Sequence, residues 1–344
     1  MSISKIMLVG EAWGEQEAEA GEPFVGPSGR VLNMLLSATG IPRNEVYLTN
    51  VFNLRPSQSS NEIRHLCGPK GEALPGYPAV TSGKYIRAEF AGELDRLFAE
   101  IKREAPNVII AAGATAAWAL LGTTGIRKVR GAPSYTFGRA AAAVGQIKVL
   151  PTYHPSAVMR EWKLRPIVLA DLDKAKREAA FPEIRRPQRE FWLQPTIADL
   201  HAFEARYITP GCDLSIDIET NNGQVTCIGF APSPSVALVV PFIDPMAKDG
   251  NYWPSLSAEL GAWKFVKRLC ETHPGIFQNG LYDVHYLWRV YGIRCFGLKD
   301  DTMLLHHSLQ PEMEKGLGFL GSVYTNEPAW KFMRAKHETL KKED

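Results

Sequence analysis

The sequence lacks the cysteine pairs that hold a disulfide framework or a zinc site. Its five cysteines lie far apart and include no CxxC pair, a distribution typical of a reducing compartment. It also lacks any apolar run near the roughly 18 residues that a membrane span needs, and it does not begin with a basic flank and an apolar core. We therefore expect a soluble, cytoplasmic protein without a membrane partner.

A large charge of either sign is missing as well. The formal net charge is +2, so any binding of nucleic acid has to come from local basic patches. By contrast, apolar residues are plentiful: 45% of the 344 residues are hydrophobic, which is enough for two packed cores. Two domains are therefore expected.

Apolar runs alternate with amphipathic segments up to about residue 180. Strands are predicted at 5–10, 45–50, 107–113 and 147–153, and helices at 28–40, 85–106 and 114–122. This order predicts a three-layer α/β domain, a parallel sheet covered by helices on both faces. In such sheets ligands collect at the carboxyl ends of the strands. The Pro-, Gly- and Ser-rich stretch 53–83 is expected to be a surface loop.

Helical periodicity stops in a stretch rich in proline and arginine at 181–196. We predict a first domain at 1–183, a linker at 184–196 and a second domain at 197–344. The second domain is expected to start with a helix at 197–207 and to continue with three consecutive strands at 212–220, 225–232 and 236–242. Helices follow these strands, which predicts a second α/β domain unlike the first.

A glycine-rich, acidic loop, GEAWGEQEAEAGEPFVGPSG, follows the first strand. It contains neither GxGxxG nor GK[ST], and Glu11, Glu15 and Glu17 would repel a pyrophosphate, so a nucleotide cradle is excluded. The loop and the later stretches VYLTNVFNLRP, RG at 130–131 and PTYHPSAVMR follow one another as the motifs of a known family do. In this order they resemble the uracil-DNA glycosylase superfamily, most closely its family four.

The resemblance implies a role for each matched residue. Phe24 would stack on a flipped uracil, and Asn50 would read the uracil edge with one donor and one acceptor, which rejects cytosine. His154 would donate to the pyrimidine oxygen that gains charge as the glycosidic bond breaks. Glu11 and Glu17 match carboxylates that organise the pocket and its water.

Three departures from the family pattern change the expected chemistry. Trp13 replaces a proline, and Ala12 stands where some glycosylase families keep a water-activating aspartate, so slow or altered activity is expected. The family's iron-sulfur cluster needs four cysteines. This region has only Cys67, with Asn53 at the place of another cysteine, and we predict no cluster.

The stretch SIDIET carries a second group of candidate residues. Asp217 and Glu219 are two apart on a predicted strand and share a face, where a divalent cation would offset their charge. Asn279 and Asp283 follow at a strand-to-helix turn. Three carboxylates that converge on one site suit Mg²⁺ or Mn²⁺, and nucleases use such ions to clamp the attacking and leaving oxygens.

DIET, the NxxxD spacing of Asn279 and Asp283, and the stretch 300–324 resemble the DEDD 3′-5′ exonucleases, specifically the proofreading domain of family A DNA polymerases, including phage enzymes. The resemblance implies a ribonuclease H-like domain with a mixed sheet. In it Asp217 and Glu219 hold both ions, Asp283 holds the outer ion, Asn279 contacts the substrate and Asp301 heads a helix. The family's third motif, with its fourth acid, is missing: Tyr324 is followed at that spacing by Pro328.

These features together predict an enzyme of DNA replication and repair: the N-terminal, glycosylase and exonuclease portion of a phage-type polymerase, at work in an infected bacterial host. Its partners would be DNA, as a single strand or a 3′ end, and a polymerase domain or polypeptide that carries the missing motif. Two alternatives remain open. One is a catalytically weak module that binds DNA and docks a polymerase, and the other is a stand-alone glycosylase with a structural second domain.

Overall fold

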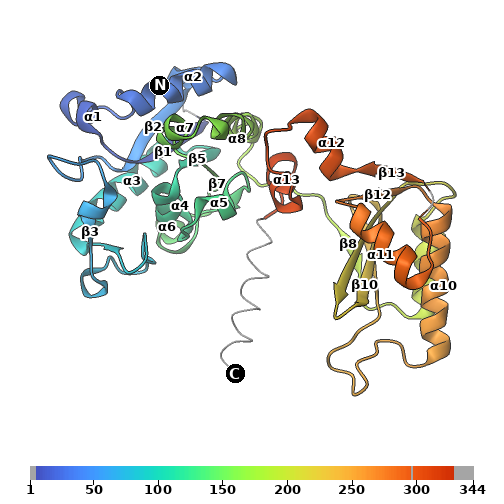
Figure 1. Cartoon of the computed structure of the whole chain (residues 1–344). Helices are drawn as coiled ribbons and strands as arrows, with labels where there is room; N and C mark the ends of the chain where they lie inside the picture. Colours follow the sequence, from blue (N-terminus) through green and yellow to red (C-terminus); the bar gives the residue numbers. More distant parts are fainter. Residues whose placement is uncertain (1–4, 296, 329–344) are drawn as a thin grey trace. The chain divides into compact units, whose positions relative to one another are not determined.

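The computed structural model describes residues 5–295 and 297–328, which form two compact units (Figure 1). The first unit comprises Met1–Arg185 and the segment from Gly318 onward, and the second comprises Arg186–Leu317. These limits differ from the predicted boundaries in two places. The predicted linker 184–196 contains strand β8 (Glu190–Trp192), which pairs with a strand of the second unit, and the segment from Gly318 belongs to the first unit.

A five-stranded sheet forms the centre of the first unit. Its order is β2 (Val46–Phe52), β1 (Ile6–Ala12), β5 (Val108–Ala112), β7 (Lys148–Thr152) and β6 (Ser134–Tyr135). The first four strands are parallel, and β6 is antiparallel. All residues of β5 and β7 are buried, as expected for a parallel sheet that is covered on both faces. The four predicted strands of this domain are all present.

Helices cover both faces of this sheet (Figure 1). On one face α2 (Pro27–Ala38) packs with α7 (Pro155–Arg160) and α8 (Arg165–Glu178), and on the other α3 (Ala91–Glu104) and α4 (Ala114–Leu121) pack with α6 (Gly138–Val144). The short helices α1 (Glu15–Ala20) and α5 (Ile126–Val129) lie in loops. This confirms the three-layer α/β architecture.

The stretch 53–83 is more than a surface loop. It buries Leu66, Leu74 and Val80 in the core that α3 and α4 share with the sheet. Tyr77 packs on Trp118 with ring centroids 4.3 Å apart. The short strand β3 (Cys67–Gly68) pairs with β4 (Tyr85–Ile86). The sequence contains too few regularly spaced apolar residues in this stretch to predict such packing.

Arg130, from the quoted RG motif, forms a buried ion pair inside the first unit. Its Nη2 atom lies 2.6 Å from Oδ1 of Asp171 on α8, and Thr152 Oγ1 donates to the other carboxylate oxygen at 2.7 Å. Both charged side chains are nearly inaccessible. Because a buried charge has to be paired, Arg130 and Asp171 lock α8 to the end of β7, close to His154.

The second unit has a mixed sheet of six strands. The order is β13 (Leu298–Asp301), β12 (Gly275–Phe277), β9 (Leu214–Asn221), β10 (Gln224–Ser233), β11 (Val236–Pro241) and β8. Strands β9 to β11 form an antiparallel meander, whereas β12 and β13 are parallel to β9. Apart from β8, the order of the strands as they follow in the chain is 5-4-1-2-3, that of a ribonuclease H-like fold.

The helices of this unit are α9 (Ile197–Tyr207), α10 (Leu256–Thr272), α11 (Leu281–Tyr291) and α12 (Thr302–Leu309), and α13 (Leu317–Tyr324) begins at its boundary. Leu200 and Phe203 of α9 and Phe265 of α10 share a core with the central strands β9 and β10. No helix in the described part of the chain is long and apolar enough to cross a membrane.

Candidate active site

A cleft of about 700 Å³ opens at the carboxyl ends of the parallel strands of the first unit. Its volume lies in the range usual for small-ligand sites, and its position is the one expected for α/β sheets. Five of the predicted site residues line it together: Glu11, Glu17, Phe24, Asn50 and His154. The cleft thus joins motifs that are up to about 140 residues apart in the sequence.

The close approach of these motifs requires a glycine at position 10. Gly10 on β1 is in register with Asn50 on the parallel strand β2. A Cβ atom on Gly10 would lie 2.2 Å from Asn50 Oδ1 and 2.5 Å from Phe24 Cζ, much closer than atoms pack. The Asn50 amide and the Phe24 ring therefore meet directly above the backbone of Gly10, and any side chain there would push them apart.

Phe24 is held in an uncommon backbone conformation. Its φ is +57°, and its side chain is only 3% exposed. Such backbone strain persists only where the surroundings enforce it, and it is frequent at functional sites. Here the Glu17 carboxylate accepts a hydrogen bond from Gly26 N at 2.8 Å, and Arg43 donates to the Phe24 carbonyl at 3.0 Å. Glu17 thereby fixes the loop that carries Phe24.

His154 stands at the N-terminus of α7, beside Phe24. The two rings are stacked with centroids 5.9 Å apart. The Nδ1 atom of His154 accepts from Ser156 N at 3.2 Å, so the proton of the neutral ring lies on Nε2. Burial, reinforced by the positive charge of Arg160, lowers the pKa of His154 to about 4. At neutral pH the ring is therefore an uncharged donor through Nε2.

Glu11 is the last residue but one of strand β1 and is half-buried. Burial raises the pKa of its carboxyl group, whereas a hydrogen bond from Thr115 Oγ1 and the charge of Arg160 act in the opposite direction. Arg160 is an exposed side chain on the rim of the cleft. Glu11 is thus a carboxylate with a fixed partner inside the cleft.

The departures from the family motifs are also visible. Ala12 lines the cleft with a methyl group, which cannot activate water. The residues near Asn53 do not fit a four-cysteine cluster, since Cys67 is the one cysteine in the sequence of the first unit. Burial raises the pKa of the Cys67 thiol, the opposite of what a metal-bound thiolate needs. Asn53 N instead donates to Glu93 Oε2 at 2.8 Å.

The metal site predicted at Asp217, Glu219 and Asp283 in the second unit stays a prediction. Within residues 5–295 and 297–328, no three His, Cys, Asp or Glu side chains are grouped as a metal ion would require. Asp217 and Glu219 do share the exposed face of β9. Asp283, however, is 4% exposed and accepts a hydrogen bond from Ile218 N at 3.0 Å. Burial raises the pKa of Asp283, and the charges of Asp301 and Glu219 add to this effect.

Asn279 and Asp301 build the turn that precedes α11. Asn279 is exposed, has a φ of +60°, and donates its backbone N–H to Asp301 Oδ1 at 3.1 Å. Asp301 is the N-cap of α12 and accepts from Met303 N at 2.8 Å and from Gly280 N at 2.7 Å. Asp301 therefore heads a helix, as the resemblance implied.

Comparison with known proteins supports the assignment of the first unit. The family profile described as the uracil DNA glycosylase superfamily matches residues 3–184. The chain is 36% identical over 177 residues to the type-4 uracil-DNA glycosylase of Thermotoga maritima, which covers 50% of this chain and 77% of that protein. It is 33% identical to the type-4 enzyme of Pyrobaculum aerophilum, over 48% and 74% of the two chains.

Among solved structures, the exonuclease domain of EXD2 soaked in Mg and dGMP is 15% identical, with a TM-score of 0.27 over 40% of this chain and 71% of that one. This likeness is too slight to support a conclusion about the second unit. The first unit, in contrast, has the parallel α/β fold, the cleft and the ordered motifs of a class of DNA glycosylases. The chain belongs to the uracil-DNA glycosylase superfamily.

Three residues around the cleft were not predicted. Thr115 holds Glu11, Arg160 lowers the pKa of His154, and Arg96 binds the backbone of Asn50. Thr115 lies three residues after the end of β5 at Ala112, and an α/β sheet collects its ligands at such strand ends. Arg96 lies three and four residues from Glu93 and Glu100, a spacing that predicts ion pairs on one helix face, but this pattern is equally typical of a solvated face.

Replacing Gly10 with alanine tests the close packing above β1. We expect Gly10→Ala to lower the free energy of unfolding of the first unit by about 1–3 kcal/mol, the usual cost of overpacking. It should also separate the Phe24 and His154 rings and return the pKa of His154 from about 4 toward 6.5. Urea unfolding and NMR measure these effects. Gly92→Ala is the control, since a Cβ at Gly92 meets open space; equal effects of both changes would contradict this packing.

The lowered pKa of His154 predicts how stability depends on pH. Between pH 6.5 and about 4 the unfolded state binds the imidazole proton and the folded state does not. The contribution of His154 to stability is therefore complete above pH 6.5 and is lost as the pH falls toward 4. NMR titration should find the imidazole neutral at pH 5.5, and His154→Gln should remove this part of the pH dependence. An imidazole that titrates near pH 6.5 would show that His154 is not an uncharged donor.

Proposed function

We propose that this chain excises uracil from DNA, and that the first unit does so. The observation that carries the proposal is the meeting of Phe24, Asn50 and His154 in one cleft at the carboxyl ends of the strands. The proposal is supported by the relatives, which are named type-4 uracil-DNA glycosylases and match over about three quarters of their length.

The geometry suggests how the three side chains divide the work. A uracil turned out of the strand stacks on Phe24, and the Asn50 amide offers one donor and one acceptor to its edge. As the bond between N1 and C1′ breaks, its electron pair moves into the uracil ring. The Nε2–H of neutral His154 donates to the pyrimidine oxygen where negative charge accumulates. A water molecule then adds to C1′ of the sugar and loses a proton, which the released uracil anion takes up.

The two carboxylates would have different tasks. Glu11 lies in the cleft and stabilises the positive charge that develops on the sugar, whereas Glu17 acts through the loop that it fixes. The methyl group of Ala12 cannot activate the attacking water. We therefore expect excision to be slow compared with enzymes that have an aspartate at this position, and we expect it to need no iron.

Release of uracil from a labelled oligonucleotide tests this proposal. We expect the wild type to release uracil from a uracil-containing strand and no base from a matched thymine strand. His154→Ala should lower the rate by about 10²-fold or more, the usual loss for one donor to a developing charge. The control is His65→Ala, because His65 is exposed and lies away from the lining of the cleft. A wild type that releases no uracil would exclude the proposal, and an unchanged rate in His154→Ala would remove His154 from the mechanism.

For the second unit we propose a role in holding DNA or docking a polymerase, without nuclease activity of its own. The hydrogen bond that Asp283 accepts from Ile218 N supports this. The wider proposal is that the chain works as the glycosylase and proofreading portion of a phage-type polymerase in replication and repair. A second polypeptide would then bring the missing Tyr or His and Asp motif and complete a Mg²⁺ or Mn²⁺ site with Asp217 and Glu219.

Digestion of end-labelled single-stranded DNA tests this second proposal. In 5 to 10 mM Mn²⁺, a concentration of about the order that weak sites need, we expect the wild type to degrade DNA no faster than Asp217→Ala. Degradation that requires the metal and is lost in Asp217→Ala would show instead that this chain forms a complete exonuclease site.

A further inference from the structure

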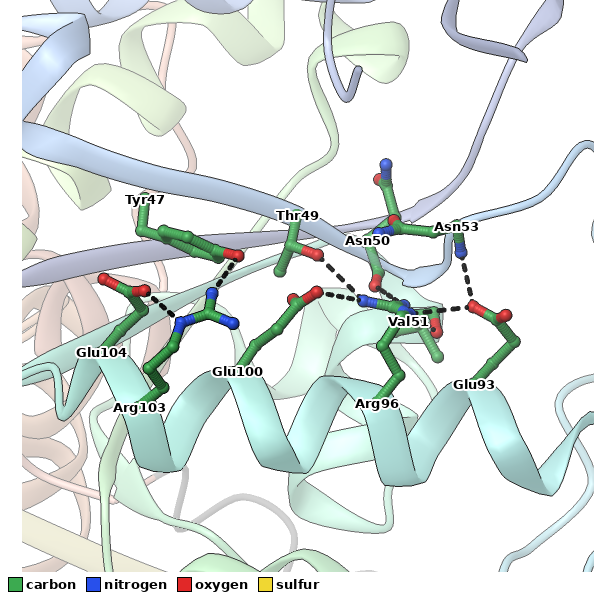
Figure 2. Close-up of polar contacts among 10 residues, drawn as sticks. All are labelled: Tyr47, Thr49, Asn50, Val51, Asn53, Glu93, Arg96, Glu100, Arg103 and Glu104. Atoms are coloured by element: carbon green, nitrogen blue, oxygen red, sulfur yellow. Dashed lines mark hydrogen bonds and ion pairs between the residues drawn. The ribbon is translucent and has the colours of Figure 1, made fainter. Parts of the chain in front are cut away.

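Arg96 of helix α3 reaches across to the part of strand β2 that carries Asn50 (Figure 2). Its Nη2 atom donates to the backbone carbonyl of Asn50 at 2.8 Å and to that of Val51 at 3.1 Å. The Nη1 atom lies 3.3 Å from Thr49 Oγ1. A guanidinium carries several donors in a rigid plane, so one arginine can bind three consecutive residues of the strand.

The place of β2 in the sheet explains why these contacts matter. β2 is the outermost strand of the sheet and pairs with β1 on its inner side. Asn50 and Val51 are nevertheless buried, with 3% and 0% of their surfaces exposed. A buried carbonyl at a sheet edge needs a donor from outside the ladder. Arg96 donates to the carbonyls of both residues from outside the ladder.

Arg96 is itself held in place by two carboxylates of its own helix. Glu93 Oε2 lies 3.1 Å from Nε, and Glu100 Oε1 lies 2.9 Å from Nη1 (Figure 2). The same Glu93 oxygen accepts from Asn53 N at 2.8 Å. Arg96 and Glu93 are only about one quarter exposed, so the pairs are better shielded from water than ordinary surface ion pairs. The end of β2 is thereby fixed to α3 on both sides of Asn50 and Val51.

We propose that Arg96 is a positioning residue that sets the uracil specificity of the cleft through Asn50. This inference rests on the proposed function, in which the Asn50 amide reads the uracil edge. Arg96 lies outside the described residues that line the cleft, so it acts on the base only through the strand. It binds the Asn50 backbone at the outer edge of the sheet, while the amide group is packed above Gly10 on the inner side.

Loss of this support should weaken recognition more than it weakens DNA binding in general. With its carbonyl released, the Asn50 amide can turn and offer its donor and acceptor in the wrong order. We expect Arg96→Ala to lower kcat/KM for uracil release by about 10- to 100-fold, as for other small misplacements of a site residue. Preference for uracil over cytosine should fall by about tenfold, whereas affinity for undamaged DNA should not change.

Arg103 provides a matched control on the same helix and strand. Its Nη2 atom donates to Tyr47 Oη at 2.7 Å, and its Nε lies 2.9 Å from Glu104 Oε1 (Figure 2). Its guanidinium also lies 5.5 Å from the centroid of the Tyr47 ring. Arg103→Ala therefore also removes an arginine contact between α3 and β2, but one made to a side chain three residues away from Asn50. We expect less than about a twofold change in preference.

The experiment measures Kd by fluorescence anisotropy for strands that carry either cytosine or 2′-fluorinated deoxyuridine, which resists cleavage. The variants are Arg96→Ala, Arg96→Lys and Arg103→Ala, each also in the Asn50→Ala background. Arg96→Lys keeps the charge for Glu93 and Glu100 but cannot bind both carbonyls, so it tests the proposal if the alanine variant does not fold. The proposal is supported if both Arg96 variants lose preference for the uracil analogue over cytosine, and if the same Arg96 changes cause no further loss in the Asn50→Ala background.

Unchanged preference in the Arg96 variants, or an equal further loss in the Asn50→Ala background, would overturn it. Hydrogen exchange over residues 46–53 needs no substrate and separates this proposal from the proposed function. If the wild type does not prefer uracil but exchange is faster in Arg96→Ala alone, the proposed function is wrong and the positioning by Arg96 stands. Exchange that is the same in Arg96→Ala and the wild type contradicts the positioning.

Discussion

The parallel alignment of β1 and β2 at Gly10 and Asn50 is the constraint on which the rest of the first unit depends. Because Gly10 has no side chain, the Asn50 amide and the Phe24 ring can lie above its backbone. The stacking of Phe24 and His154 follows from this arrangement, and so does the burial that keeps the His154 ring neutral. Glu17, Arg43 and Arg96 hold these parts from outside. The cleft is therefore a consequence of backbone packing first and of side-chain chemistry second.

The sequence predicted the first unit well where its signals are local. Apolar runs bounded by glycine and proline predicted the four parallel strands, and the resemblance to the glycosylase superfamily implied roles in one pocket for Phe24, Asn50 and His154. It could not predict the contacts made by Arg96, because an arginine between two glutamates at helical spacing reads as a solvated surface. Packing of the stretch 53–83 was missed for a similar reason: its buried residues are irregularly spaced.

The acidic residues of the second unit were predicted from motif spacing. Alternation along β9 correctly predicted that Asp217 and Glu219 share one face, and the resemblance to the exonucleases implied the mixed sheet. Asp283 differs, because β12 pairs with the beginning of β9 only, at Leu214 and Ser215. The N–H of Ile218 beyond that point takes Asp283 as its acceptor. Residue spacing in a sequence indicates which side chains lie near one another, but it does not specify which group becomes the hydrogen-bond partner of a buried carboxylate.

The account stands on the claim that one cleft reads uracil with Asn50 and His154. Titration of the isotope-labelled protein with free uracil, followed by NMR, tests this most directly. Uracil should shift the side-chain amide resonances of Asn50 and the Nε2–H resonance of His154, and cytosine at the same concentration should leave both in place. If uracil leaves both unchanged, or if cytosine shifts them equally, the cleft does not read uracil and the central claim is wrong.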